Sequence, residues 1–157
     1  MMSQPLWQRP DIIDWSQRLL ASYRHWLGQD LLPLAAAAPE AARQLFWAPR
    51  VVVSHGTQAD PVLNYGNQAA LDLWQLNWDR FTQTPSRHTA EPMHRQERTN
   101  MLAQLEAQGY VDNYRGVRIS SQGRRFYIER AIIWNVVDDT GKRVGQAATF
   151  KEWQFLS

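Results

Sequence analysis

Two sets of residues have the types and spacing that could support chemistry. His88, Glu91 and His94 form an H-x-x-E-x-x-H run, and imidazole and carboxylate are common zinc ligands. On a helix, however, residues six apart point about 120° away from each other, and Pro92 interrupts this segment. We therefore expect a solvated loop here and no metal site.

The second set is Ser54, His55 and Asp60, which have the residue types of a nucleophile, a base and an acid. Ser54 and His55 are adjacent in a predicted strand, so their side chains point to opposite faces and cannot share a proton. The sequence offers no other convergent acid–base pair, and we expect no catalytic activity.

Arginines form two further groups. Arg87, Arg95 and Arg98 lie near a predicted helix start, where an anionic ligand could bind. The alternative is that they form ion pairs with neighbouring carboxylates. Arg118 and Arg130 lie on predicted strands, and each would need a carboxylate partner if half-buried.

An amphipathic helix is predicted over residues 11–27. Its apolar residues recur every three or four positions: Ile12, Trp15, Leu19, Tyr23 and Trp26. This stripe either packs on the core of its own chain or forms the seam of a homodimer.

The remaining pattern predicts helices and strands in a fixed order. Short helices are expected at 40–47, 67–76 and 78–81, a loop at 84–92, and a longer helix at 93–108. Strands are expected at 50–55, 62–65, 110–120, 125–137 and 143–153, with Asn67 as an N-cap and Gly116 as a bulge. Hairpin connections require antiparallel pairing, so the fold class is α+β, a five-stranded antiparallel sheet covered by short helices.

Composition narrows the classes of function. The chain has 157 residues, a net charge of +2, and no Cys, which excludes disulfides and thiol chemistry. No basic block favours a nucleic-acid partner. No apolar run reaches the ~18 residues of a membrane helix, and the N-terminus lacks a signal peptide. We expect a cytoplasmic protein.

Several short segments together resemble the MEKHLA domain family, a branch of PAS-like domains. They include N-Y-G-N-Q-A-A-L-D-L-W (64–74), R-I-S-S-Q-G-R-R-F (118–126), W-N-V-V-D (134–138) and G-Q-A-A-T-F (145–150). The resemblance covers about residues 45–155. It implies a PAS-like domain over 45–157, preceded by a helical extension over 1–44, and a sensory or dimerisation role.

The resemblance also implies a small-molecule pocket between the curved sheet and its helices, mostly apolar with a few polar groups. The candidate ligand-binding residues are Asn67, Trp74, Trp78, Phe81, Arg98, Met101, Leu105, Arg118, Trp134 and Phe150. Strand alternation does not say which side of 132–137 faces the pocket, because both sides are apolar. We expect Trp134 to face it, since a large aromatic side chain is costly to expose.

Three hypotheses about function follow. The first is a PAS-like ligand-binding or sensory module that acts as a homodimer through residues 11–27. The second is an interaction module with a filled core, and the third is an enzyme or carrier on an NTF2-like cone. The cofactor is unknown: covalent flavin chemistry needs a Cys, and no histidine lies at a mid-pocket position suited to haem.

Overall fold

The computed structural model describes residues 4–33 and 37–157. Three helical elements precede the first strand: η1 (Leu6–Gln8), α1 (Pro10–Leu27) and α2 (Ala38–Phe46). The predicted 11–27 helix is confirmed as α1, which Gly28 ends in a left-handed conformation. Part of the segment between α1 and α2, residues 34–36, lies outside the described residues.

The remaining elements follow the predicted order and confirm the α+β class. They are β1 (Val51–His55), β2 (Leu63–Gly66), α3 (Gln68–Trp74), α4 (Trp78–Phe81), η2 (Ser86–Thr89), α5 (Arg95–Gln108), β3 (Tyr110–Ile119), β4 (Arg125–Val137), β5 (Arg143–Phe150) and β6 (Glu152–Phe155). The loop predicted at 84–92 contains the short helix η2, and the last predicted strand is divided into β5 and β6 at Lys151.

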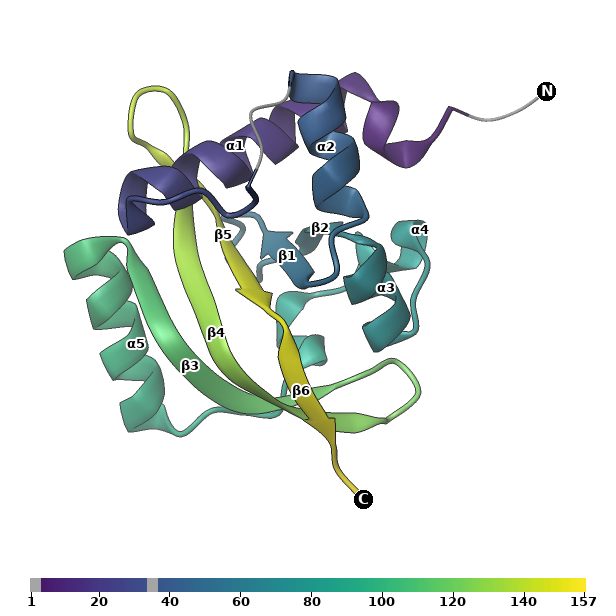
Figure 1. Ribbon diagram of the computed structural model, residues 1–157. Coiled ribbons are helices and arrows are strands. Elements are labelled where there is room, and N and C mark those ends of the chain that lie inside the picture. Colours follow the sequence, from purple (N-terminus) through teal and green to yellow (C-terminus); the bar gives the residue numbers. More distant parts are fainter. Residues whose placement is uncertain (1–3, 34–36) are drawn as a thin grey trace.

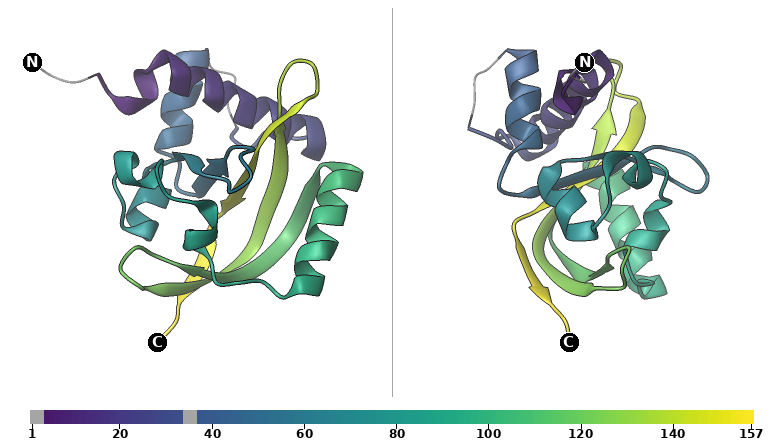
Figure 2. Two further views of the ribbon diagram at one scale, coloured as in Figure 1. Left: turned by 180° about the vertical axis from the view of Figure 1, so that it is seen from behind. Right: turned by 90° about the vertical axis from the view of Figure 1, so that its right-hand side faces the viewer.

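The strands form one antiparallel sheet in the order β2-β1-β5-β4-β3, and β6 pairs with the first half of β4. Figure 1 shows α5 alongside β3, with α3 and α4 near β1 and β2. Figure 2 shows the long β3–β4 hairpin curving away from α1 and α2. The register of β3 and β4 shifts between Tyr114 and Gly116, which confirms the bulge predicted there.

The two faces of this sheet have different covers. Val52, Ala147 and Trp134 lie on one face, which packs against α1, and we call it the α1 face. Because neighbouring residues of a strand alternate, Val53, Ala148 and Ile133 lie on the other face. Side chains of α3 and α5 pack on that face, which we call the α3 face.

The apolar stripe of α1 is buried within the chain. Ile12, Leu19 and Tyr23 are at most 5% exposed, and the indole Nε1 of Trp15 donates to Ser54 Oγ at 2.9 Å. The indole Nε1 of Trp26 donates to the Asn135 carbonyl at 2.8 Å. The prediction that this stripe is a dimer seam is therefore wrong, because the chain's own sheet already covers it.

Asn67 joins the sheet to α3, as its predicted role of N-cap requires. Its Oδ1 accepts from the backbone N–H of Ala70 at 3.2 Å and from that of Val52 at 3.0 Å. Its Nδ2 donates to the carbonyls of Leu45 at 3.1 Å and Arg50 at 2.7 Å. One buried side chain thus connects α2, β1 and α3.

Candidate functional site

A small cavity of about 90 Å³ lies on the α3 face of the sheet, beneath η2. Its floor comes from β1, β4 and β5, one wall comes from β3, and its cover comes from α3 and η2. The residues that line it are Val53, Ser54, His55, Leu63, Trp74, Ser86, Thr89, Tyr114, Arg118, Ile128, Ala131, Ile133, Gln146, Ala147, Ala148 and Phe150.

Backbone hydrogen bonds hold the cover at both ends. The N–H of Ser86 donates to the Pro61 carbonyl at 2.8 Å on the β2 side. The N–H of Glu91 donates to the Val117 carbonyl at 3.3 Å on the β3 side. Between them, Trp74 Nε1 donates to the Thr89 carbonyl at 3.2 Å. The segment therefore closes the cavity from one edge of the sheet to the other.

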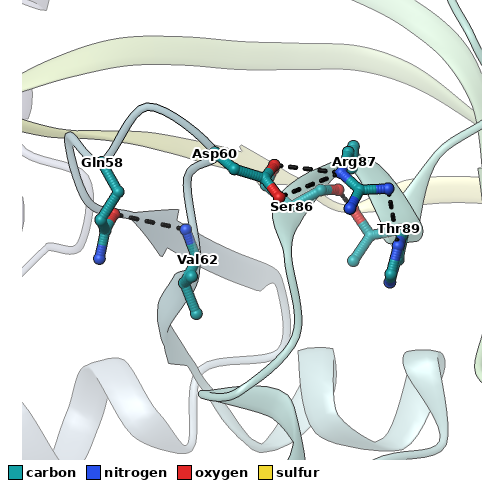
Figure 3. A network of polar contacts seen from close by, with 7 residues as sticks. Gln58, Asp60, Val62, Ser86, Arg87 and Thr89 are labelled. Carbon is teal, nitrogen blue, oxygen red and sulfur yellow. Dashed lines mark hydrogen bonds and ion pairs between the residues drawn. The ribbon is translucent and has the colours of Figure 1, made fainter.

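Polar contacts also join the cover to the β1–β2 loop. Figure 3 shows Arg87 Nε donating to the two carboxylate oxygens of Asp60, at 3.1 and 3.2 Å. Thr89 Oγ1 donates to the Ser86 carbonyl at 2.7 Å and stiffens the short helix. The Asp60–Arg87 pair is more than half exposed, so it adds little to stability.

Arg118 is the permanently charged residue of the cavity lining. It pairs in register with Phe126, a residue of the core on the α3 face. Its guanidinium lies 5.4 Å from the ring centre of Tyr114, and its Nη1 donates to the Val117 carbonyl at 3.3 Å. No carboxylate in the described residues forms an ion pair with it.

His55 supplies a second nitrogen-bearing side chain. Burial lowers its pKa, and the nearby charge of Arg143 lowers it further, although a hydrogen bond to the Gly56 carbonyl acts in the opposite direction. The neutral ring donates from Nδ1 to that carbonyl at 2.8 Å, which leaves Nε2 as an acceptor. Gln146, the register partner of His55, adds an amide beside it.

The structure brings three of the predicted site residues to the cavity: Trp74, Arg118 and Phe150. Asn67 is buried, but each of its two polar atoms already makes two hydrogen bonds inside the chain. The expectation that Asn67 faces a ligand is therefore wrong. No donor or acceptor position of its amide is left for one.

Trp134 is on the wrong face for the predicted role. Its indole is fully buried on the α1 face, where it packs edge-on against Tyr23 with ring centres 5.0 Å apart. Its register partner is Ala147, which in turn pairs with Ser54, and these small residues leave room for the indole beneath α1. The expectation that Trp134 faces the pocket is therefore wrong.

The other predicted site residues lie beside the cavity or away from it. Phe81 packs over Gly66, and Trp78 packs against Tyr65. Leu105 and Met101 fill the space between α5 and Ile133. Arg98 is exposed on α5. None of these side chains lines the cavity.

Sequence reasoning missed several of the lining residues. His55 has the residue type of a catalytic base or a haem ligand, but alternation along the strand also places it on the same face as Val53. Tyr114 could be reached only with the bulge known, because the shift in register turns it toward Ala131. Ser86 and Thr89 belonged to a predicted loop, and nothing in their spacing indicated that the loop closes a cavity.

The two sets of residues that suggested chemistry are separated in the structure. Ser54 bonds to Trp15 and Asn64, His55 to the Gly56 carbonyl, and Asp60 to Arg87. Glu91 forms an ion pair with Arg125. Residues 4–33 and 37–157 contain no cluster of three metal-ligating side chains.

The cavity does not fit the larger PAS cofactors. Its volume of about 90 Å³ is far below the roughly 300–1,000 Å³ of pockets for drug-sized ligands. Flavin and haem would both require the cover and the sheet to separate. Covalent flavin chemistry also lacks its Cys.

Comparison with known proteins places this arrangement in a family. The family model described as the MEKHLA domain matches residues 13–155, a span that includes most of α1. The homeobox-leucine zipper protein ATHB-9 of Arabidopsis thaliana is 31% identical over 100 residues, covering 64% of this chain and 12% of that protein. HOX9 of Oryza sativa subsp. indica is 25% identical over 150 residues, covering 95% of this chain and 18% of that protein. The chain thus spans less than a fifth of these relatives.

Solved structures show the same fold. The PAS domain of a protein from Colwellia psychrerythraea matches with a TM-score of 0.61 and 14% identity, over 74% of this chain and 94% of that one. An RNA-binding light-oxygen-voltage receptor matches with a TM-score of 0.62 and 19% identity, over 76% of this chain and 34% of that one. The fold is PAS-like, so the NTF2-like alternative is wrong. The chain belongs to the MEKHLA domain family.

Proposed function

We propose that this chain is a sensory module that binds a small molecule in the cavity beneath η2. The observation that carries the proposal is the lining itself. Apolar side chains of the sheet, among them Ile133 and Phe150, surround polar ones that include Arg118, His55 and Gln146. A largely apolar hollow with a few polar groups is the usual form of a small-molecule site.

The position of the cavity supports a sensory role. Its cover is tied to β2 through Pro61 and to β3 through Val117, so a ligand that shifts the cover acts on both edges of the sheet. The described residues contain no helix that could cross a membrane. We propose that the signal passes to a partner protein or to a second copy of the chain.

Filling the cavity tests the proposal. Ala148→Leu adds three carbons on the cavity face of β5, whereas Ala103→Leu adds them on the exposed side of α5. The wild type and both variants are purified without denaturation, and released small molecules are identified by mass spectrometry. We expect the wild type and Ala103→Leu to release the same molecule, and Ala148→Leu to release at least tenfold less. Equal release by all three folded proteins, or none by the wild type, would contradict the proposal.

A different observation favours a second candidate function, an interaction module that pairs two copies. An open apolar groove of about 410 Å³ lies between α2 and the α3–α4 region, lined by Leu6, Trp7, Phe46, Trp47, Leu71, Leu76 and Trp78 among others. Trp47 is 56% exposed, which is costly for so large a side chain. Sedimentation velocity of the wild type and Trp47→Ser separates the cases: a dimer lost in the variant supports this candidate, and a wild-type monomer opposes it.

A further inference from the structure

We infer that the ligand of the cavity is a short-chain monocarboxylate whose carboxylate binds Arg118. This inference rests on the proposed function, because it names the chemical class of molecule that the same cavity would take.

The charge of Arg118 favours an anionic ligand. Arg118 is half-buried over an apolar core, and charged groups in such positions are normally paired. The nearest acidic residue of the cover, Glu91, is bonded through its backbone to Val117, the neighbour of Arg118. Its carboxylate nevertheless pairs with Arg125. None of the residues that line the cavity is acidic. Arg118 is thus a cation without an acidic partner among the described residues, facing a cavity without negative charge.

The geometry of the guanidinium favours a carboxylate. The guanidinium lies over the ring of Tyr114, 5.4 Å from the ring centre, and one backbone carbonyl takes only one of its five N–H groups. A planar guanidinium held in this way can donate two parallel hydrogen bonds to a carboxylate. Ser86 and Gln146 line the same cavity and offer further donors.

The size of the cavity favours a short ligand. A volume of about 90 Å³ equals roughly three water molecules at their share of liquid volume. Among carboxylates, one with a short alkyl chain fits that space. Ile128, Ile133 and Phe150 provide apolar walls for such a chain. With Arg118 the one permanently charged residue of the lining, a second carboxylate on the ligand would be unpaired.

The test is an NMR titration of the uniformly ¹⁵N-labelled chain with sodium propionate, with propionamide as the neutral probe of the same shape. We expect propionate to shift the indole N–H of Trp74, which reports on the cover through Thr89, together with the amides of residues 86–89 and 133. Propionamide should bind at least tenfold more weakly. Sodium chloride at the same concentrations corrects for ionic strength.

Variants of two arginines test whether Arg118 is the residue that binds the carboxylate. Arg118→Gln should weaken propionate binding at least tenfold, whereas Arg115→Gln, an exposed arginine on the same strand, should leave it unchanged. Arg118→Lys keeps the charge but loses the paired hydrogen bonds, and it should bind with intermediate affinity. It also serves as the test if Arg118→Gln does not fold.

The outcomes separate this inference from the proposed function. If propionate and propionamide shift the same signals with equal affinity, the cavity binds small molecules and the carboxylate assignment is wrong. If propionate shifts only residues outside the cavity, or if Arg115→Gln weakens binding as much as Arg118→Gln, the assignment is also wrong. If neither probe binds and the native protein releases no small molecule, both the carboxylate assignment and the proposed function are wrong.

Discussion

At the scale of single residues, Asn67 shows how one amide can organise a junction. Its side chain makes four hydrogen bonds to backbone groups of residues 45, 50, 52 and 70, all within the folded chain. The short strand β2 can pass directly into α3 because this side chain replaces the backbone partners that are missing there.

Asn67→Ala should therefore lower the free energy of unfolding by at least about 3 kcal/mol, since it leaves several buried polar groups without partners. Asn77 is the matched control, because it caps α4 with one exposed bond to the Arg80 N–H at 2.9 Å. Asn77→Ala should cost only about 1 kcal/mol. Urea denaturation measures both, and equal losses would contradict the role given to Asn67.

Tyr65 presents the opposite situation. Its side chain is fully buried on the α1 face, burial raises its pKa, and its hydroxyl has no hydrogen-bond partner among the described residues. The hydroxyl of Ser16 lies close by and lowers the pKa of Tyr65 in part, but neither hydroxyl makes a hydrogen bond of normal geometry within the described residues. An unpaired buried hydroxyl is a cost to folding.

Tyr65→Phe should consequently keep or raise the free energy of unfolding, by up to about 1 kcal/mol. Ser54→Ala should lower the free energy of unfolding by about 1 kcal/mol, because the Ser54 hydroxyl is bonded to Trp15 of α1 and to Asn64 of the neighbouring strand β2. Chemical denaturation of both variants measures these changes in the free energy of unfolding. A clear loss for Tyr65→Phe would indicate that the Ser16 hydroxyl or a bound water pairs the Tyr65 hydroxyl.

At the scale of elements, Gly109 lies where α5, β4 and α1 meet. It ends α5 with a φ of 85°, and its carbonyl accepts from the Asn135 N–H at 2.9 Å. A Cβ at this position would lie 2.3 Å from the indole of Trp26 on α1. Only glycine satisfies both the conformation and the contact.

Gly109→Ala should cost more than about 3 kcal/mol, because left-handed strain adds to a clash with a packed aromatic ring. Gly123 has a similar φ of 81° with open space around it, so Gly123→Ala isolates the strain and should cost about 1–2 kcal/mol. Thermal unfolding of the two variants compares their losses of stability. Equal losses would show that α1 can move away from the end of α5.

Periodicity predicted most elements, and its failures have physical reasons. The bounds of β4 followed from the turn residues that flank it, and those of α1 followed from the helical stripe, and both are local properties of the chain. The side of the sheet on which Trp134 lies could not be predicted, because helices cover both sides of the sheet and each side of the strand is apolar. The helical cover at 86–89 depends on distant backbone partners at Pro61 and Val117, which no local pattern contains.

At the scale of the whole molecule, α1 is part of the core that β1, β4 and β5 form. Residues 37–157 alone would expose Val52, Trp134 and Val136, all of which are fully buried beneath α1. Each large buried apolar side chain contributes about 1.5–3 kcal/mol, which is a large part of the stability of a small domain. We expect this fragment to lack a cooperative thermal transition, as followed by near-UV circular dichroism. A sharp transition would show that the sheet folds without α1.

The stability of the whole chain should also depend on pH through His55. Its pKa is lowered in the folded state, so the unfolded state binds the proton more readily. The folded state keeps its full stability above the unfolded pKa of about 6.5 and loses it as the pH falls toward the folded value. His55→Gln should therefore show a smaller fall in melting temperature between pH 7.5 and 5.5 than the wild type, whereas His25→Gln, an exposed control, should not. Identical falls in all three would contradict this role.

The central claim is that the cavity beneath η2 holds a small molecule, and electron density tests it most directly. Crystals of the protein purified without denaturation should show non-solvent density between the guanidinium of Arg118 and the side chain of Ile133, beneath residues 86–89. A cavity that holds only water, or one that side chains have closed, would contradict the account.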